Sequence, residues 1–180
     1  MNCQAHCWYC FENACTEKHT MSKGVTLDTI EFIKTQILRS QCEELCLLFF
    51  GGEPLLAIDQ IMTIGEAISS YCESNSIKFH SEVISNGIAF TSEVADRIIP
   101  AIHMSSLQVT LDGIRTTHDK SKGIPCFDRV IENIVENADK TRISVRVNVS
   151  SKNKDEIAEL VDWLMVDKGL DGKIRVYLAR

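Results

Sequence analysis

The sequence has no long hydrophobic run and little proline. Its longest apolar stretch, residues 45–50, is far shorter than the ~20 residues that a membrane-spanning helix requires. The N-terminus is too polar for a signal peptide. Three prolines in 180 residues, 44% of which are hydrophobic, exclude a proline-rich or disordered chain. We therefore expect a folded domain in the cytoplasm.

An excess of basic residues is also absent. Nineteen lysines and arginines stand against 25 aspartates and glutamates, which gives a net charge of -6. Sequence-independent binding to phosphates or to anionic lipids depends on an excess of positive charge. We therefore expect neither nucleic acid nor a membrane among the partners of the protein.

Cysteine, in contrast, is abundant, with eight residues. The share is below that of a secreted disulfide scaffold and no secretory signal accompanies it, so reduced thiols are expected. Four of the cysteines crowd the first fifteen residues, namely Cys3, Cys7, Cys10 and Cys15. Such crowding requires a chemical explanation.

Apolar residues at helical spacing alternate with short β-branched runs along the chain. Asn153 and Glu156 resemble a capping box before the last helix, and Gly169 stands where that helix should stop. Alternating helices and strands with right-handed crossovers imply a parallel sheet. The pattern predicts helices over residues 26–39, 58–73 and 127–138, one from residue 91 or 92 and one over 157–164, and strands over 45–50, 78–85, 107–111, 143–149 and 173–178.

Two of these strands are polar on one face. Ser144, Arg146 and Asn148 alternate with hydrophobic residues, whereas a sheet covered by helices on both faces should be apolar on both. This favours a curved sheet with helices outside and a polar ligand inside, although a sandwiched sheet with a few hydrogen-bonded polar residues remains the alternative. A complete eight-stranded barrel has about 250 residues. We therefore expect an α/β fold, a partial (β/α)6 TIM-like barrel with parallel strands, formed by residues 1–180 as one domain whose first strand is missing.

The first three cysteines are close enough in sequence to bind one metal centre from a single loop. Cys3, Cys7 and Cys10 occupy eight residues. Structural zinc sites and electron-transfer clusters use four protein ligands, whereas a catalytic metal keeps one position open. Three thiols suggest an open site, but Cys15 or a nearby histidine, His6 or His19, would complete a closed one. Spacing alone leaves both possibilities open.

A glycine-rich turn follows the first predicted strand. Gly51 and Gly52 allow the backbone to turn sharply and to approach a ligand, and Glu53 and Pro54 suit the start of a helix. At the carboxyl end of a strand, this turn would lie on the rim where barrel active sites are built. The Glu53 carboxylate is then available to an ammonium group, although an ordinary strand-to-helix turn would have the same sequence.

Together these motifs identify a resemblance to a known family. The Cys3-x3-Cys7-x2-Cys10 spacing with an aromatic residue before the third cysteine, the Gly-Gly-Glu-Pro turn, and the strand ends at residues 85–87 and 110–113 resemble the radical S-adenosylmethionine superfamily. Residues 118–120 and 127–134 resemble the branch of anaerobic sulfatase-maturating enzymes and peptide-modifying, SPASM-type maturases. No C-terminal domain for auxiliary clusters, as found in such maturases, is expected within this chain.

The resemblance implies that Cys3, Cys7 and Cys10 ligate a 4Fe-4S cluster, whose remaining iron is chelated by S-adenosylmethionine. Lys122 stands near the place of a family arginine that meets the methionine carboxylate, but a lysine cannot form the forked contact. By the same resemblance, S-adenosylmethionine would be bound by Tyr9 near its adenine, by Gly51, Gly52, Glu53 and Pro54 at its ammonium, by Ser85, Asn86 and Thr110 beside its ribose, by Arg146 or Asn148, and by Leu178 over its adenine.

The resemblance also implies a reaction. Reductive cleavage of S-adenosylmethionine would yield methionine and a 5'-deoxyadenosyl radical, which abstracts hydrogen from a substrate, here a peptide or protein side chain. A low-potential electron donor of the flavodoxin or ferredoxin type is then required. The alternative is a non-enzymatic module that holds zinc or a closed iron-sulfur cluster with Cys15 as the fourth ligand.

Overall fold

The computed structural model describes residues 2–14 and 19–179 and contains one parallel sheet with its helices. In this part of the chain, no helix is both long and apolar enough to cross a membrane. The strands are β1 (Glu44–Phe49), β2 (Lys78–Ser85), β3 (Met104–Thr110), β4 (Arg142–Asn148) and β5 (Ile174–Ala179). The α-helices are α1 (Lys23–Ser40), α2 (Ile58–Ser74), α3 (Ser92–Ala101), α4 (Arg115–Lys122), α5 (Phe127–Asn137) and α6 (Ile157–Asp162). Short helical turns lie at Phe11–Ala14, Pro54–Leu56 and Trp163–Asp167.

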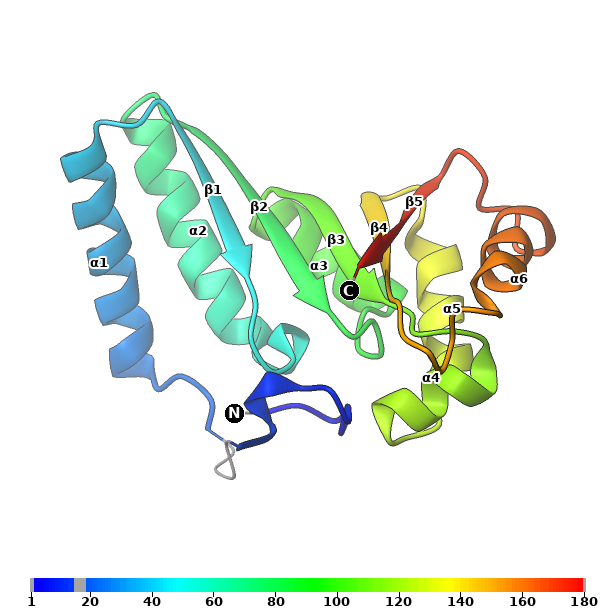
Figure 1. Ribbon diagram of the computed structural model, residues 1–180. Helices are drawn as coiled ribbons and strands as arrows, with labels where there is room; N and C mark the ends of the chain where they lie inside the picture. The colour runs from blue at the N-terminus through cyan, green and yellow to red at the C-terminus, as the bar shows by residue number, and fades with distance from the viewer. Residues whose placement is uncertain (1, 15–18, 180) are drawn as a thin grey trace.

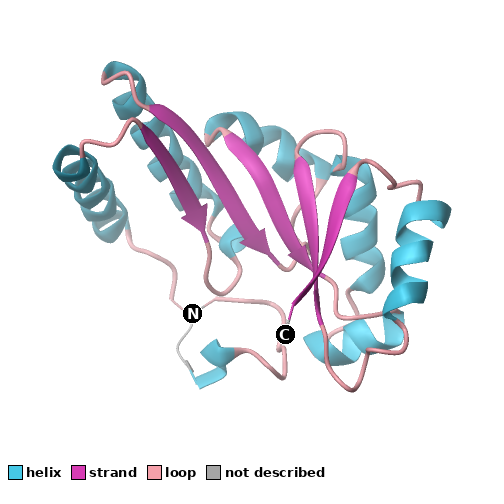
Figure 2. Ribbon diagram, turned by 45° about the horizontal axis from the view of Figure 1, so that its top comes forward, coloured by secondary structure: helices cyan, strands magenta, loops and turns pink. Residues whose placement is uncertain are grey.

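The five strands follow one another across the sheet in sequence order, and every pair is parallel. Successive crossovers of one hand in one direction place their helices on the same face. Figure 2 shows this arrangement, with helices behind the strands and the other face of the sheet uncovered. The α/β partial-barrel prediction is confirmed, and the alternative of a sheet sandwiched between helices is wrong for the described residues.

The alternation along the strands decides which face is covered. Leu107, Ile143 and Val145 point into the main core between the sheet and α3, α5 and α6. A second core joins α1 and α2 to the first two strands through residues such as Ile37 and Ile68. The intervening positions of the strands form the uncovered face, which we call the open face. It carries the polar residues that the sequence pattern had separated from the core.

The predicted capping box is wrong. Helix α6 begins only after Glu156, whose carboxylate accepts hydrogen bonds from the Ile114 amide at 3.1 Å and the Thr117 hydroxyl at 3.0 Å. Glu156 thus supplies the N-terminal acceptor that α4 lacks locally, since Ile114 makes no side-chain cap. Helix α4 itself was not predicted, because its sequence is polar on nearly every side. The expected stop at Gly169 is confirmed by its positive φ of 63° after the last helical turn.

Candidate functional site

The cysteine motif lies on a loop, residues 2–12, which we call the cysteine loop. It lies at the carboxyl ends of the strands, between the end of β1 and α4 (Figures 1 and 2). One side of this loop is bound to the glycine-rich turn: the Glu53 amide donates to the Asn2 carbonyl at 2.8 Å, and the Gly52 amide donates to the Glu12 carboxylate at 2.7 Å. Both ends of the motif are therefore held against the same turn.

The other side of the cysteine loop is bound to the end of α4. The His6 amide donates to the Lys122 carbonyl at 2.7 Å, and the Trp8 amide donates to the Ser121 carbonyl at 3.3 Å. Gly123, the residue after Lys122, has a φ of 69°, and a Cβ atom there would lie 3.0 Å from the His6 carbonyl oxygen. Glycine is required here both for the left-handed backbone and for the close approach of the loop.

Cys3, Cys7 and Cys10 are all partly buried on this loop. Burial raises the pKa of Cys3 and of Cys7 above the ordinary thiol value, so binding a metal as thiolates would release protons. Within the described residues, the three sulfur atoms do not all lie within 4.8 Å of one another. A tetrahedral zinc ion would bring its thiolates to about 3.8 Å apart. Three thiols on one loop are nevertheless the donor set that an iron-sulfur cluster, or a zinc ion with a fourth ligand, requires.

Cys15, the fourth ligand of the closed-site alternative, lies outside the described residues. Among the described residues, the side-chain amide nitrogen of Asn86 is 3.7 Å from the Cys3 sulfur and donates toward it. A hydrogen bond from a neutral donor stabilises a thiolate without occupying a metal position. This places one of the predicted site residues, Asn86, directly beside the cysteines.

Glu53 is buried and joins the ends of β1 and β2. Its carboxylate accepts hydrogen bonds from the backbone amides of Leu55 at 3.0 Å and Asn86 at 2.7 Å, and from the Ser85 hydroxyl at 2.8 Å. Burial raises its pKa, while these hydrogen bonds favour the charged form. Because three of its roughly four acceptor positions are occupied, Glu53 has little capacity left for an ammonium group. Its contact with S-adenosylmethionine stays a prediction.

The remaining predicted residues of this turn have clear backbone roles. Gly51 and Gly52 have φ values of 102° and 52°, which side chains rarely adopt. Pro54 begins the short helical turn that leads into α2. Ser85 donates to Glu53 and also accepts a hydrogen bond from the Gly87 amide at 2.9 Å, so its donor and one of its two acceptor positions are used within the turn.

Asp112 connects the cysteine loop to the sheet. The Tyr9 hydroxyl donates to one of its oxygens at 2.5 Å, and the Lys122 ammonium lies 3.1 Å from the same oxygen and 2.9 Å from the Tyr9 hydroxyl. Its other oxygen accepts from the Asn148 amide at 3.1 Å. Burial, and then the Asp112 carboxylate, raise the pKa of Tyr9 far above its ordinary value. These bonds make Asp112 a positioning residue, which holds the cysteine loop against the sheet.

Lys122 is accordingly buried behind Tyr9, with its side chain only 3% exposed. Its ammonium contacts the Asp112 carboxylate and the Tyr9 hydroxyl. The predicted contact with a methionine carboxylate stays a prediction, and in this structure the charge of Lys122 is neutralised by Asp112.

A group of potential ligands was missed at the sequence level. One ligand atom from each of His118, Asp119 and Cys126 lies within 4.8 Å of the others. However, Asp119 accepts hydrogen bonds from the Cys126 and Phe127 amides at 2.8 Å, and His118 Nδ1 accepts from the Asp112 amide at 3.2 Å. With Nδ1 accepting, the proton of His118 is on Nε2, 3.5 Å from the Cys126 sulfur. The group therefore caps α5 and orients Asp112.

A cavity of about 530 Å³ lies between the cysteine loop and the open face. We call it the upper cavity. The cysteine loop contributes aromatic rings to its lining, whereas the strands contribute polar side chains. Four predicted residues, Tyr9, Thr110, Arg146 and Asn148, meet here, together with Trp8, Phe11, Phe50 and Asp112. A cavity with this lining suits the polar ligand that the strand pattern predicted.

Leu178 does not line this cavity. It pairs with Val147, whose side chain points into the core, so the register directs Leu178 to the helix-covered face. Its neighbour Tyr177 pairs with Arg146 on the open face and donates to Gln108 at 2.5 Å. Neither residue is among those that line the upper cavity, and the contact of Leu178 with the adenine of S-adenosylmethionine stays a prediction.

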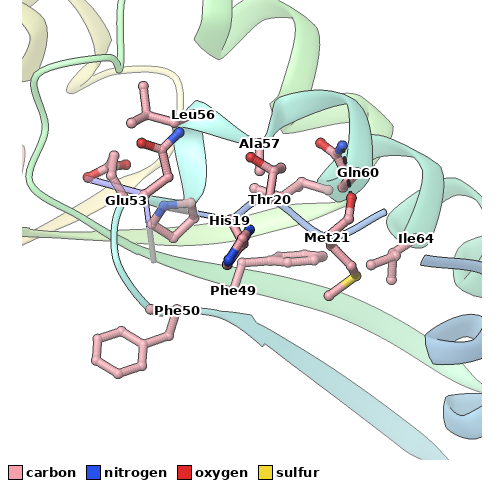
Figure 3. Close-up of a pocket in the computed structure, with 14 residues that line it drawn as sticks. His19, Thr20, Met21, Phe49, Phe50, Glu53, Leu56, Ala57, Gln60 and Ile64 are labelled. Carbon is pink, nitrogen blue, oxygen red and sulfur yellow. Dashed lines mark hydrogen bonds between the residues drawn. The ribbon is translucent and has the colours of Figure 1, made fainter. Parts of the chain in front are cut away.

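A smaller hollow of about 190 Å³ lies on the other side of the glycine-rich turn (Figure 3). Residues 19–21, the end of β1 and the start of α2 surround it, and the Gln60 amide donates to the Met21 carbonyl at 3.4 Å. Glu53 lies at its edge, and Figure 3 shows the Phe50 ring pointing away from it. This hollow is separate from the polar strand residues.

The geometry agrees with the family that the motifs resemble. A family model described as the Radical SAM superfamily matches residues 1–164, and the chain belongs to this superfamily. A 4Fe-4S cluster and S-adenosylmethionine are characteristic of the family, and the predicted cofactors are thus confirmed as those of the family.

Individual relatives cover the chain well but are much longer. The radical SAM cyclopropyl synthase TigE of Paramaledivibacter caminithermalis is 26% identical in an alignment 151 positions long, which covers 75% of this chain and 31% of TigE. Native anSMEcpe with bound AdoMet and a Kp18Cys peptide matches with a TM-score of 0.79 at 17% identity, over 99% of this chain and 49% of that one. Streptococcus suis SuiB bound to precursor peptide SuiA matches with a TM-score of 0.67 at 19% identity, over 99% and 37%. The chain thus spans half or less of each relative.

Proposed function

We propose that residues 1–180 are the S-adenosylmethionine-binding core of a radical enzyme that modifies a peptide or protein side chain. The observation that carries this proposal is the position of the cysteine loop. It is fixed between the glycine-rich turn and α4, directly beside the upper cavity. A three-cysteine motif, an adjacent cavity and a polar strand lining are together what this chemistry requires.

Cys3, Cys7 and Cys10 would hold three irons of a 4Fe-4S cluster and leave the fourth for the amino and carboxylate groups of S-adenosylmethionine. When bound, the cluster supplies the electron for reductive cleavage to methionine and a 5'-deoxyadenosyl radical, which takes hydrogen from the substrate. The second candidate is a closed site with Cys15 as the fourth ligand, which would hold zinc or an iron-sulfur cluster without an open position.

Residues of this chain would bind and orient the ligand in the upper cavity and shield it from water. Tyr9 offers its ring at the edge of the upper cavity while its hydroxyl is fixed by Asp112. Arg146 donates to Asn148 at 2.9 Å, and Asn148 donates to Asp112, so the polar groups at the end of β4 are held in place before a ligand arrives. Such preorganisation reduces the cost of orienting the reactants. The aromatic rings of the loop would exclude water from the reactive centre.

The substrate class is supported by the relatives. The anSMEcpe and SuiB structures contain bound peptides, and TigE is named as a cyclopropyl synthase. A peptide lying along the open face would reach the upper cavity from the sheet. An electron donor of the flavodoxin or ferredoxin type and a cytoplasmic location complete the proposal.

Anaerobic reconstitution with iron and sulfide, followed by reduction and addition of S-adenosylmethionine, tests the proposal. We expect four irons per chain and release of 5'-deoxyadenosine, both lost in Cys3→Ala, Cys7→Ala and Cys10→Ala. Cys46→Ala is the matched control, since Cys46 is exposed on β1, and it should retain both. One zinc per chain, no cleavage with iron, and loss of metal in Cys15→Ala would support the closed site instead.

A further inference from the structure

The open face has a second hollow, of about 550 Å³, nearer the amino ends of the strands. We call it the lower hollow. Its charged lining includes Glu82, Arg142 and Arg175. It adjoins the upper cavity, because Ser144 in its lining pairs with Gln108, which lines the upper cavity. A ligand lying along β3 and β4 would occupy both.

Neither arginine of the lower hollow is paired with a carboxylate. Arg142 donates through Nε to the Ser105 carbonyl at 3.3 Å, and within the described residues no Asp or Glu forms an ion pair with Arg142 or Arg175. Lys173, which also lines the hollow, differs because its ammonium pairs with Asp139. Lys140 likewise pairs with Asp96. In a protein of net charge -6, two unpaired arginines in one hollow are a local site for an anion.

The register of the sheet brings the two arginines together. Arg175 pairs with Ser144, and Arg142 lies two residues before Ser144 on the same face. Diagonal neighbours on adjacent strands are about 7–8 Å apart, which long side chains span. Both guanidinium groups can therefore reach one carboxylate, and arginine offers it the two parallel hydrogen bonds that make such pairs specific.

We propose that the lower hollow binds a carboxylate of the substrate peptide and so selects peptides with an acidic residue about four residues from the modified one. This inference rests on the proposed function and names its substrate class more closely. Arg142 and Arg146 are four residues apart on β4, or about 13 Å. An extended peptide anchored by its carboxylate in the lower hollow therefore places a side chain about four residues away in the upper cavity.

Glu82 limits what the lower hollow accepts. It lies on β2 and pairs with Ser106, the residue that pairs in turn with Arg142. A polyanion such as RNA would bring several phosphates against Glu82, whereas a single carboxylate is directed to the arginines. A peptide with one acidic residue is thus favoured over a nucleic acid.

Fluorescence anisotropy with short labelled peptides tests the inference. The peptides are acetylated and amidated, and one contains a single glutamate where its partner contains glutamine; a third has a free C-terminal carboxylate and no acidic side chain. We expect the glutamate peptide to bind at least tenfold more tightly than the glutamine peptide.

Arg142→Gln and Arg175→Gln should each remove most of this preference. Arg129→Gln, on the outer side of α5, should leave it unchanged. Preference for the third peptide would assign the anchor to a chain terminus.

Equal affinity for the glutamate and glutamine peptides, or a preference that survives both arginine substitutions, would overturn the inference, as would tighter binding of single-stranded RNA. Binding is measured without cluster or S-adenosylmethionine. Failure of the proposed function instead appears as a lack of 5'-deoxyadenosine in the reconstituted protein. Arg175→Glu provides a further check, because it should reverse the preference toward a lysine-containing peptide if the variant keeps the wild-type circular dichroism spectrum.

Discussion

At the scale of single residues, Asp112 joins several distant segments of the site. Its side chain meets Tyr9, Lys122 and Asn148, its amide is held by His118, and its carbonyl accepts from Asn153 at 2.7 Å. These contacts join positions up to 103 residues apart in the chain. Asp112 therefore holds the cysteine loop, α4 and the end of β4 in one arrangement.

Lys122→Met should destabilise the protein. It leaves the Asp112 carboxylate buried without its cation, and removing one partner of a buried ion pair costs about 3–5 kcal/mol. Urea unfolding of the metal-free protein measures the change. The double variant Lys122→Met with Asp112→Asn should recover part of the loss, because no uncompensated charge remains. Equal midpoints and slopes for Lys122→Met and wild type would contradict this account of the pair.

Because His118 is buried, we expect the free energy of unfolding to depend on pH. Burial first, and the Lys122 charge second, lower its pKa to about 4, from an ordinary value near 6.5, while the carboxylates of Asp112 and Asp119 act against the shift. Below pH 6.5 the unfolded chain therefore binds a proton that the folded chain does not. Folding free energy is lost as the pH falls from 6.5 toward 4, by about 3 kcal/mol for this group.

The comparison with His118→Asn isolates this contribution from the other titrating groups. The asparagine oxygen can accept from the Asp112 amide but cannot titrate. The difference in unfolding free energy between wild type and variant should shrink by about 3 kcal/mol between pH 7 and pH 4. A difference that stays constant over this range would show that His118 does not titrate as its burial requires.

The sequence revealed the thiols and the glycine-rich turn because their spacing within a few residues is itself the signal. It did not reveal the role of Lys122 or Glu156, since each acts on a distant segment. Glu156 accepts from Ile114, 42 residues earlier, and was taken for a local cap. Contacts of that kind depend on tertiary packing and leave no pattern in adjacent residues.

At the scale of elements, α4 is the support for the cysteine loop. Its last carbonyls accept the His6 and Trp8 amides, and Gly123 ends the helix with room for the loop beside it. The helix was overlooked because it lacks an apolar stripe and its cap comes from another segment. Its position could be learned only from the structure.

Gly123→Ala should loosen the cysteine loop. A Cβ atom would meet the His6 backbone and side chain at 3.0–3.1 Å, so the hydrogen bonds from His6 and Trp8 should weaken. Amide hydrogen exchange of residues 6 and 8 is then expected to accelerate. Gly169→Ala is the matched control, because Gly169 has a similar φ of 63° but nothing within 4 Å of the added Cβ. The same exchange rates in both variants would contradict the support role of α4.

At the scale of the whole molecule, strand periodicity predicted the fold well. Polar residues at alternate positions of β3 and β4 identified a sheet covered on one face only, and the structure has its helices on that one face. The cavity and the lower hollow both lie on the uncovered face. Periodicity could not give the register at β5, which places Tyr177 on the open face with Arg146 and Leu178 on the helix-covered face with Val147.

The central claim concerns a metal cluster with one iron free of protein ligands. Mössbauer spectroscopy of the protein reconstituted with ⁵⁷Fe, recorded before and after addition of S-adenosylmethionine, tests it most directly. We expect the signal of one iron in the cluster to shift on addition while the other three stay unchanged. Four irons whose signals are all insensitive to S-adenosylmethionine, or a protein that retains zinc in place of iron, would contradict the account.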